Sequence, residues 1–161
     1  PNDVLVGWKK IGGILCESLG EDLGHSCVVG MGLNVNVIAK ELEAFKDNFF
    51  GATSFSVETG SEAALLEVQE TVLSKLFSLY QLYQADGFYP IQYLWEKNCG
   101  FVGKKIELRE SGWRDVKLVR GDPGATVGTM VGIDDTGALV LSNAKGERRS
   151  YFTGEITCFW P

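Results

Sequence analysis

The first seventeen residues constrain the fold of this chain more than any other stretch. Two short apolar runs, Val4 to Val6 and Ile11 to Cys16, flank a glycine-containing turn at Gly7-Trp8. Apolar runs of this length around a short turn are typical of two antiparallel strands. The sequence therefore predicts a β-hairpin at the start of the chain.

The second strand of this hairpin begins with a charge and continues with two glycines. Lys10 is followed, one residue later, by Gly12-Gly13. Glycine weakens a strand interior and often marks a place where something approaches the backbone closely. We therefore expect a flat, electron-rich ligand over Gly12-Gly13, beside the ammonium of Lys10. The carboxylate of Asp3 could share this site only if the sheet brings it to the lysine.

A second glycine-containing strand is predicted from Cys27 to Val35, and its apolar content indicates that it is buried. The two-residue period of a strand places Gly30, Gly32 and Asn34 on one side. One interpretation is a sheet face packed tightly against a helix. The other is a flat surface under a planar ligand, with Asn34 offering a donor and an acceptor to the edge of a base.

Two helices are expected in the middle of the chain. Thr59 and Glu62 have the spacing of a capping box, and apolar residues then recur at three and four positions from Leu65 to Tyr83. Gly87 is suited to end this helix. A second, shorter helix is predicted from Pro90, a residue favoured in the first turn, to about Asn98.

The pattern changes from helical to strand-like at about residue 103. Turn residues then recur at intervals of roughly ten, which is typical of a small all-β barrel or sandwich. The fold class expected for the whole chain is therefore α+β, with a boundary between residues 1–103 and 104–161. The five predicted strands are Ile106 to Leu108, Val116 to Val119, Thr126 to Ile133, Ala138 to Leu141 and Arg149 to Phe152.

Charge and composition exclude several classes of function. The net charge is −6 and the basic clusters are short, which argues against a nucleic-acid partner. No apolar run approaches the length of a membrane span, and His25 is the single histidine, so a histidine-based metal site is not expected. The four cysteines lack C-x-x-C spacing, and we interpret them as reduced core residues of a cytoplasmic protein. They are Cys16, Cys27, Cys99 and Cys158.

Four motifs in this chain resemble those of the bacterial biotin protein ligases, in the same order and spacing. The first is Pro1-Asn2-Asp3 followed by Lys10-Ile11-Gly12-Gly13-Ile14-Leu15 and Glu17. The others are Gly30-Met31-Gly32-Leu33-Asn34-Val35-Asn36, Ala52-Thr53-Ser54-Phe55, and Gly132-Ile133-Asp134 to Gly137-Ala138-Leu139 with Gly154-Glu155-Ile156. Each motif is weak alone, but together they cover nearly the whole chain.

This resemblance implies a two-step reaction that uses ATP, biotin and Mg²⁺. Biotin is first converted to biotinyl-5′-AMP and is then transferred to a lysine of an acceptor protein. The implied catalytic residues are Lys10 and Asp3, and no residue is implied to be a dedicated metal ligand. The residues implied to bind biotin or the adenylate are Asn2, Lys10, Gly12, Gly13, Ile14, Gly30, Gly32 and Asn34.

The resemblance also implies a fold and a set of partners. Residues 1–103 would be the C-terminal portion of a class II synthetase-like catalytic domain, and residues 104–161 its SH3-like C-terminal domain. The family's Gly-Arg-Gly-rich loop, which covers biotin and the phosphates, is not found in this sequence, so we expect a fragment that is inactive without the N-terminal half. The implied partners are that half, the biotin carboxyl carrier domain of a carboxylase, and a second copy in a homodimer.

Two alternatives remain open at this point. The chain could be a non-catalytic module that dimerises or docks an acceptor, or it could be part of a related lipoate or octanoyl transferase. A DNA-binding repressor would require an N-terminal helix-turn-helix, which this sequence does not contain.

Overall fold

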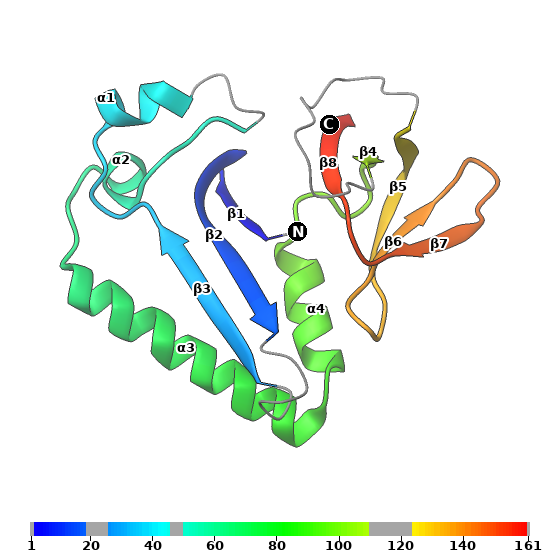
Figure 1. The fold of residues 1–161 in the computed structure, drawn as a ribbon, viewed down its shortest axis with the longest axis horizontal. Helices are drawn as coiled ribbons and strands as arrows, with labels where there is room; N and C mark the ends of the chain where they lie inside the picture. Colours follow the sequence, from blue (N-terminus) through cyan, green and yellow to red (C-terminus); the bar gives the residue numbers. More distant parts are fainter. Residues whose placement is uncertain (1, 19–25, 46–49, 110–123, 161) are drawn as a thin grey trace. The chain divides into compact units, whose positions relative to one another are not determined.

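The computed structural model describes residues 2–18, 26–45, 50–109 and 124–160. It contains helices and two antiparallel sheets, as expected for an α+β protein (Figure 1). The chain divides into two compact units, Pro1–Leu73 and Ser74–Pro161, and each is considered by itself. The division falls within the longest helix, so the boundary predicted at residues 103–104 stays a prediction.

The first unit contains a three-stranded sheet in the order β1-β2-β3, and this confirms the predicted hairpin. Its strands are β1 (Asp3–Val6), β2 (Lys9–Ser18) and β3 (Cys27–Leu33). The turn between β1 and β2 has φ angles of 53° at Gly7 and 65° at Trp8. Two positive φ angles in a two-residue loop match the twist of the flanking strands, so the turn suits a tight hairpin. Residues 19–25, which include His25, lie outside the described residues.

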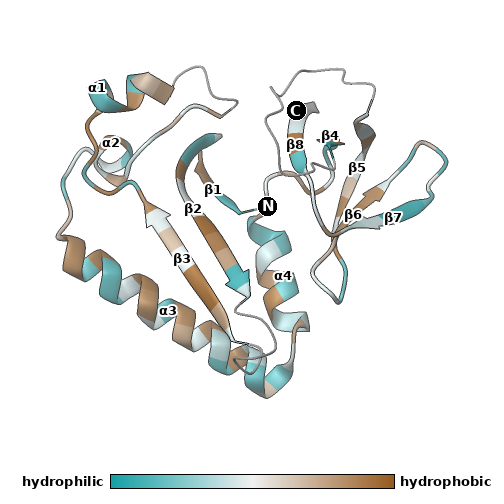
Figure 2. Ribbon diagram, viewed as in Figure 1, coloured by the Kyte–Doolittle hydropathy of each residue, from teal (hydrophilic) through white to brown (hydrophobic). Residues whose placement is uncertain are grey.

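The prediction that β3 is buried is wrong, since every residue of this strand is exposed. Val29 and Met31 keep 43% and 42% of their surface accessible. Among the described residues, no helix makes an extensive contact with either face of β3. The apolar colouring of β3 and of the later part of β2 in Figure 2 therefore marks accessible surface. Cys16 and Cys27 lie on these accessible strands and are exposed free thiols. The prediction that they are core residues is therefore wrong.

Short helical segments follow β3, and one predicted cap is wrong. They are α1 (Ala39–Leu42), the 3-10 turn η2 (Glu43–Phe45) and α2 (Phe55–Thr59). The cap of α2 is Ser54, whose hydroxyl accepts a hydrogen bond from the Val57 amide at 3.2 Å. Thr59 instead ends α2 and donates its hydroxyl proton to the Phe55 carbonyl at 2.8 Å. The capping box predicted from Thr59 and Glu62 therefore does not form.

The two longer helices are confirmed. Helix α3 spans Leu65–Asp86, and Gly87 follows it with a φ angle of 75°, the left-handed conformation expected of a glycine after a helix. Helix α4 spans Tyr89–Asn98 with its proline in the first turn. No helix among the described residues is both long and apolar enough to cross a membrane.

The second unit contains a five-stranded antiparallel sheet in the order β7-β6-β5-β4-β8. Four of the five predicted strands are confirmed, and the predicted strand Val116 to Val119 lies outside the described residues. The final strand, β8, was not predicted. The strands are β4 (Lys105–Arg109), β5 (Thr126–Ile133), β6 (Leu139–Ser142), β7 (Arg148–Tyr151) and β8 (Glu155–Trp160).

Helix α4 is attached to this sheet by both apolar and polar contacts. Trp95 packs against the buried cluster of the sheet, which is made of Ile106, Leu108, Met130, Leu141 and Tyr151. The Gln92 side chain donates a hydrogen bond to the carbonyl of Ile133. The backbone amide of Ile133 in turn donates to the Glu96 carboxylate at 3.1 Å. Helix and sheet therefore form one packed body within the second unit.

Candidate functional site

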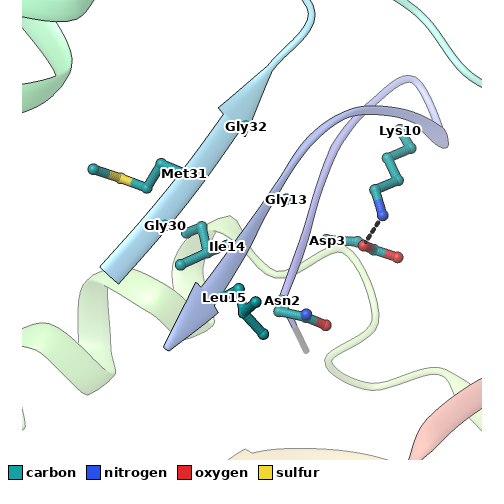
Figure 3. Close-up of a pocket in the computed structure, with 9 residues that line it drawn as sticks. All are labelled: Asn2, Asp3, Lys10, Gly13, Ile14, Leu15, Gly30, Met31 and Gly32. Carbon is teal, nitrogen blue, oxygen red and sulfur yellow. Dashed lines mark ion pairs between the residues drawn. The ribbon is translucent and has the colours of Figure 1, made fainter. Parts of the chain in front are cut away.

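The hairpin brings the two predicted catalytic residues together. The Nζ atom of Lys10 lies 2.5 Å from Oδ1 of Asp3, and the two side chains are 46% and 36% exposed. The pair lies at an open pocket of about 440 Å³ in the first unit (Figure 3). The described residues that line this pocket are Asn2, Asp3, Lys10, Gly13, Ile14, Leu15, Gly30, Met31 and Gly32.

A bulge in β2 explains why Lys10 points into this pocket. In the register of the hairpin, Leu5 pairs with Lys10 but Val4 pairs with Gly12, so Ile11 has no partner in β1. An extra residue in one strand shifts its side-chain alternation by one position and can re-aim a side chain. Lys10 consequently shares a face with Gly13, where strict alternation would have placed it with Gly12.

The partner strands bring further residues to this face. Asp3 pairs with Gly13, and Gly13 pairs with Gly32 on the other side of β2. Directly opposite residues in adjacent strands project to the same side of a sheet. The acid, the lysine and the glycines are therefore gathered by the register of three adjacent strands.

Three glycines leave space in the pocket. Among the described residues, a Cβ atom at Gly32 would have no neighbour within 4 Å, and one at Gly13 would lie 3.6 Å from both Cε and Nζ of Lys10. Gly30 is similarly open, with the Leu15 carbonyl oxygen at 3.7 Å. The space beside Lys10 thus depends on missing side chains, and the predicted roles of Gly13, Gly30 and Gly32 in ligand binding stay predictions.

Apolar residues complete the pocket lining, and two of them were not predicted. Leu15 shares the side of Gly13 and Gly30, whereas the side chains of Ile14 and Met31 point to the other side of the sheet (Figure 3). Ile14 was predicted, whereas Leu15 and Met31 were missed. Leu15 pairs with Gly30, and Ile14 pairs with Met31. The pairing of β2 with β3 was the signal that could have identified Leu15 and Met31. It places Leu15 opposite the predicted Gly30, and Met31 opposite the predicted Ile14.

Gly12 and Asn34 are not among the described residues that line the pocket. At Gly12, a Cβ atom would come 2.4 Å from the Gly32 carbonyl oxygen, so the neighbouring strand makes the close approach there. The Asn34 side chain donates its amide proton to the Thr53 carbonyl at 3.0 Å. Both residues have structural contacts here, and their predicted roles in ligand binding stay predictions.

The described residues contain no group of three or more histidine, cysteine or acidic side chains that could hold a metal ion. Among those that line the pocket, the acidic residue is Asp3, and its Oδ1 already contacts Lys10. One paired carboxylate does not form a metal cage. A single carboxylate can serve only an ion that takes most of its ligands from a substrate, as Mg²⁺ does from phosphates.

Comparisons with known proteins agree with the motifs. Residues 114–157 match the family described as the biotin protein ligase C terminal domain. The bifunctional ligase/repressor BirA of Bacillus spizizenii is 32% identical over 153 residues, which are 94% of this chain and 43% of the relative. The biotin–[acetyl-CoA-carboxylase] ligase of Paracoccus denitrificans is 32% identical over 92% of this chain and 57% of the relative. The similarity to biotin protein ligases is confirmed.

A solved structure supports the same assignment at the level of the fold. The biotin protein ligase from Aquifex aeolicus, in complex with biotin and ATP, aligns with a TM-score of 0.71 and 23% sequence identity. The alignment covers 99% of this chain and 60% of the Aquifex chain. This chain spans about half the length of the curated biotin ligases that it matches.

Proposed function

We propose that this chain forms part of an enzyme that attaches biotin to a lysine of a biotin carboxyl carrier acceptor, with ATP as the energy source. The observation that carries the proposal is the Lys10–Asp3 pair at a pocket lined by glycines. The named ligase relatives support this assignment, as does a structural neighbour that was solved with biotin and ATP.

The first step of the proposed reaction transfers AMP to biotin. The carboxylate of biotin attacks the α-phosphorus of ATP, a P–O bond forms, and pyrophosphate leaves to give biotinyl-5′-AMP. Negative charge increases on the phosphate oxygens in the transition state. A fixed cation at that position stabilises the transition state more than the bound substrates, which lowers the barrier. The ammonium of Lys10 is the group that we assign to this role.

The second step releases AMP and forms the amide. The amine of the acceptor lysine attacks the carbonyl carbon of the mixed anhydride, the C–O bond to AMP breaks, and the amine loses a proton. Charge again passes to the phosphate oxygens of the leaving group. Lys10 is therefore positioned to serve both steps without a change of place.

Asp3 is assigned a positioning role through its contact with Lys10. A lysine has a flexible four-carbon stem, and half of the Lys10 side chain is exposed. A carboxylate at 2.5 Å restricts the ammonium to one part of the pocket. Asp3 would thereby reduce the reorganisation required when the phosphate binds.

The flat part of the pocket is assigned to the biotinyl-adenylate. Gly13, Gly30 and Gly32 would allow the ligand to approach the strands closely, while Leu15, which shares their side of the sheet, offers apolar contact to the hydrocarbon part of biotin. Asn2 offers a hydrogen-bonding amide at the same edge. Mg²⁺, where it takes part, would be held mainly by the phosphates, with Asp3 as the available carboxylate, and would neutralise phosphate charge.

Further parts of the proposal concern the whole protein. We propose that the sheet of the second unit corresponds to the SH3-like domain of the family and supports closure over ATP. The carrier domain as acceptor, a homodimer and a cytoplasmic location belong to the same proposal. They follow from the resemblance of the motifs and from no contact within this chain.

The test uses the complete gene product and measures pyrophosphate release that depends on biotin and ATP. We expect Lys10→Ala to slow adenylate formation by about 2 to 4 orders of magnitude, as the loss of one preorganised charge contact does in other enzymes. Lys9→Ala is the matched control, because Lys9 is the adjacent lysine but does not line the pocket.

Three results would decide against the proposal. A Lys10→Ala rate within threefold of wild type would remove Lys10 from the mechanism. Pyrophosphate release that depends on lipoate or octanoate in place of biotin would assign the chain to the related transferases. A complete protein that binds the carrier domain but releases no pyrophosphate would be a docking module.

A further inference from the structure

The segment Gly51–Thr53 lies against β2 at Lys10. Lys10 forms a parallel bridge with Ala52. The amide of Lys10 donates to the Gly51 carbonyl at 3.4 Å, and the amide of Thr53 donates to the Lys10 carbonyl at 2.9 Å. This segment thus pairs with the start of β2, on the same edge along which β3 pairs with β2 from Gly12 onward.

The position of these contacts matters because it coincides with the bulge. Beyond Lys10, Ile11 has no partner in β1, so the ladder of the hairpin is interrupted there. On the edge of β2 that faces away from β1, the backbone amide of Asn34 donates to the Ile11 carbonyl at 2.8 Å. On this same edge, the backbone of Lys10 is fixed chiefly by Gly51 and Thr53.

Thr53 is itself fixed by every polar group that it has. Its side chain is fully buried, and its hydroxyl donates to the carboxylate of Glu58 in α2. Its carbonyl accepts the side-chain amide of Asn34 at 3.0 Å. A buried hydroxyl with a charged acceptor is held more firmly than one with a neutral partner.

We propose that Thr53 and Glu58 are positioning residues for Lys10. The Glu58 carboxylate orients Thr53, the Thr53 amide holds the Lys10 carbonyl, and the Lys10 backbone then directs its ammonium to Asp3 and the pocket. Glu58 is exposed and does not line the pocket, so its effect on the reaction passes through Thr53. This inference rests on the proposed function, because it assumes that the ammonium of Lys10 serves the reaction.

The experiment compares variants of the complete gene product in biotin-dependent pyrophosphate release. We expect Thr53→Val and Glu58→Ala each to lower kcat about tenfold, with KM for biotin and ATP within about twofold, because binding contacts stay in place. Thr53→Ser and Glu58→Gln keep the donor and the acceptor, and they should restore most of the rate. Thr59→Val is the matched control, since the partners of the Thr59 hydroxyl in the described part of the chain all lie in its own helix and the following turn.

A double variant separates positioning from a general loss of structure. If Thr53 acts through Lys10, then Thr53→Val should change the residual rate of the Lys10→Ala enzyme by less than about twofold. A purely structural role would lower that residual rate by the same factor as in the wild type. Hydrogen exchange of the Lys10 amide, which donates to Gly51, should be faster in Thr53→Val and unchanged in Thr59→Val.

The possible failures are distinguishable. A wild-type kcat in Thr53→Val, with a clear loss in Lys10→Ala, would overturn the positioning role and leave the proposed function standing. An additive loss in the double variant, or a loss without faster exchange at Lys10, would overturn it as well. A complete protein without biotin-dependent release would overturn both.

Discussion

Gly12 and Gly32 lie so close on neighbouring strands that a Cβ atom on Gly12 would come 2.4 Å from the Gly32 carbonyl oxygen. The atom that blocks this position belongs to the backbone of a paired strand, so it cannot move without disturbing the sheet. The bulge at Ile11 lies immediately before this contact. The close approach therefore fixes β2 against β3 at the point where the pocket begins.

The first prediction concerns this contact. Gly12→Ala should lower the free energy of unfolding by about 1–3 kcal/mol, because an added methyl group in a packed site forces the backbone to shift. Urea denaturation followed by circular dichroism measures the change. Gly32→Ala is the comparison, since a Cβ at Gly32 meets no atom of the described chain within 4 Å and should cost little stability.

The same pair separates folding from ligand binding. Gly32→Ala places a methyl group in the pocket, so in the complete gene product it should weaken biotin binding while stability is retained. Isothermal calorimetry measures the affinity. Equal stability losses at Gly12 and Gly32 would contradict the assignment of Gly12 to strand packing.

A second prediction concerns the open form of the pocket. Sites for small ligands typically enclose most of the ligand surface, whereas Lys10 here is 46% exposed and the neighbouring strand β3 is exposed along its length. We therefore expect the isolated 161-residue chain to bind biotin with a Kd of about 1 mM or weaker. Calorimetry on the isolated chain tests this. Micromolar affinity would mean that these strands hold biotin without further cover.

A third prediction concerns the contact between α4 and the second sheet. Gly132 has a φ angle of 149°, and a Cβ there would come within 2.1 Å of Oε1 of Glu96. The Glu96 carboxylate can move, but it would then lose its hydrogen bond from the Ile133 amide. Backbone strain and this lost bond together should make Gly132→Ala destabilising by about 3 kcal/mol.

Two further variants divide this cost. Gly146 also has a positive φ angle, 81°, and no described atom lies within 4 Å of its Cβ position, so Gly146→Ala should show the strain of its own backbone conformation alone, about 1–2 kcal/mol. In a Glu96→Ala background, Gly132→Ala should cost less than it does in the wild type, because the bond is already absent. Thermal or urea unfolding of the wild type, the three single variants and the Glu96→Ala/Gly132→Ala double variant provides the comparison. An unchanged cost in the Glu96→Ala background would show that the carboxylate is not involved.

The sequence predicted the elements of the fold better than the details of the site. The hairpin follows from the two apolar runs around Gly7, and the helix that ends at Gly87 follows from its period. The bulge at Ile11 could not be predicted, because a period of two places Lys10 with Gly12. That shift depends on how β2 pairs with both of its neighbours, which is not a local property of the sequence.

Two other differences have similar causes. Thr59 is a competent N-cap by its residue type, but the chain uses it as the last residue of α2, and the long helix begins later, at Leu65. The exposure of β3 could not be inferred from its apolar residues, since burial depends on what covers a strand as well as on its composition. Tertiary contacts decided each case, in agreement with the weak power of local propensity.

A fourth prediction concerns the pH dependence of the turn that begins at Asp134. Oδ1 of Asp134 accepts the hydroxyl of Thr136 at 2.6 Å, and Oδ2 accepts the hydroxyl of Ser150 at 2.7 Å. These two hydrogen bonds, with further ones from the amides of Ala138 and Thr136, lower the pKa of Asp134 from 3.8 to about 2. Because hydrogen bonds stabilise the ionised carboxylate in the folded protein, folding favours loss of this proton.

The sign of the effect on stability follows from this shift. The unfolded chain binds the proton at a higher pH than the folded chain does, so the stabilising contribution is complete above about pH 4 and is lost as the pH falls toward 2. We expect Asp134→Asn to be less stable than wild type at pH 5 but to lose less stability between pH 4 and pH 2. Urea unfolding at a series of pH values measures this, with Asp135→Asn as the adjacent control. If Asp134→Asn and wild type lost stability in parallel over this range, the hydrogen bonds of Thr136 and Ser150 would not hold the carboxylate in its ionised form.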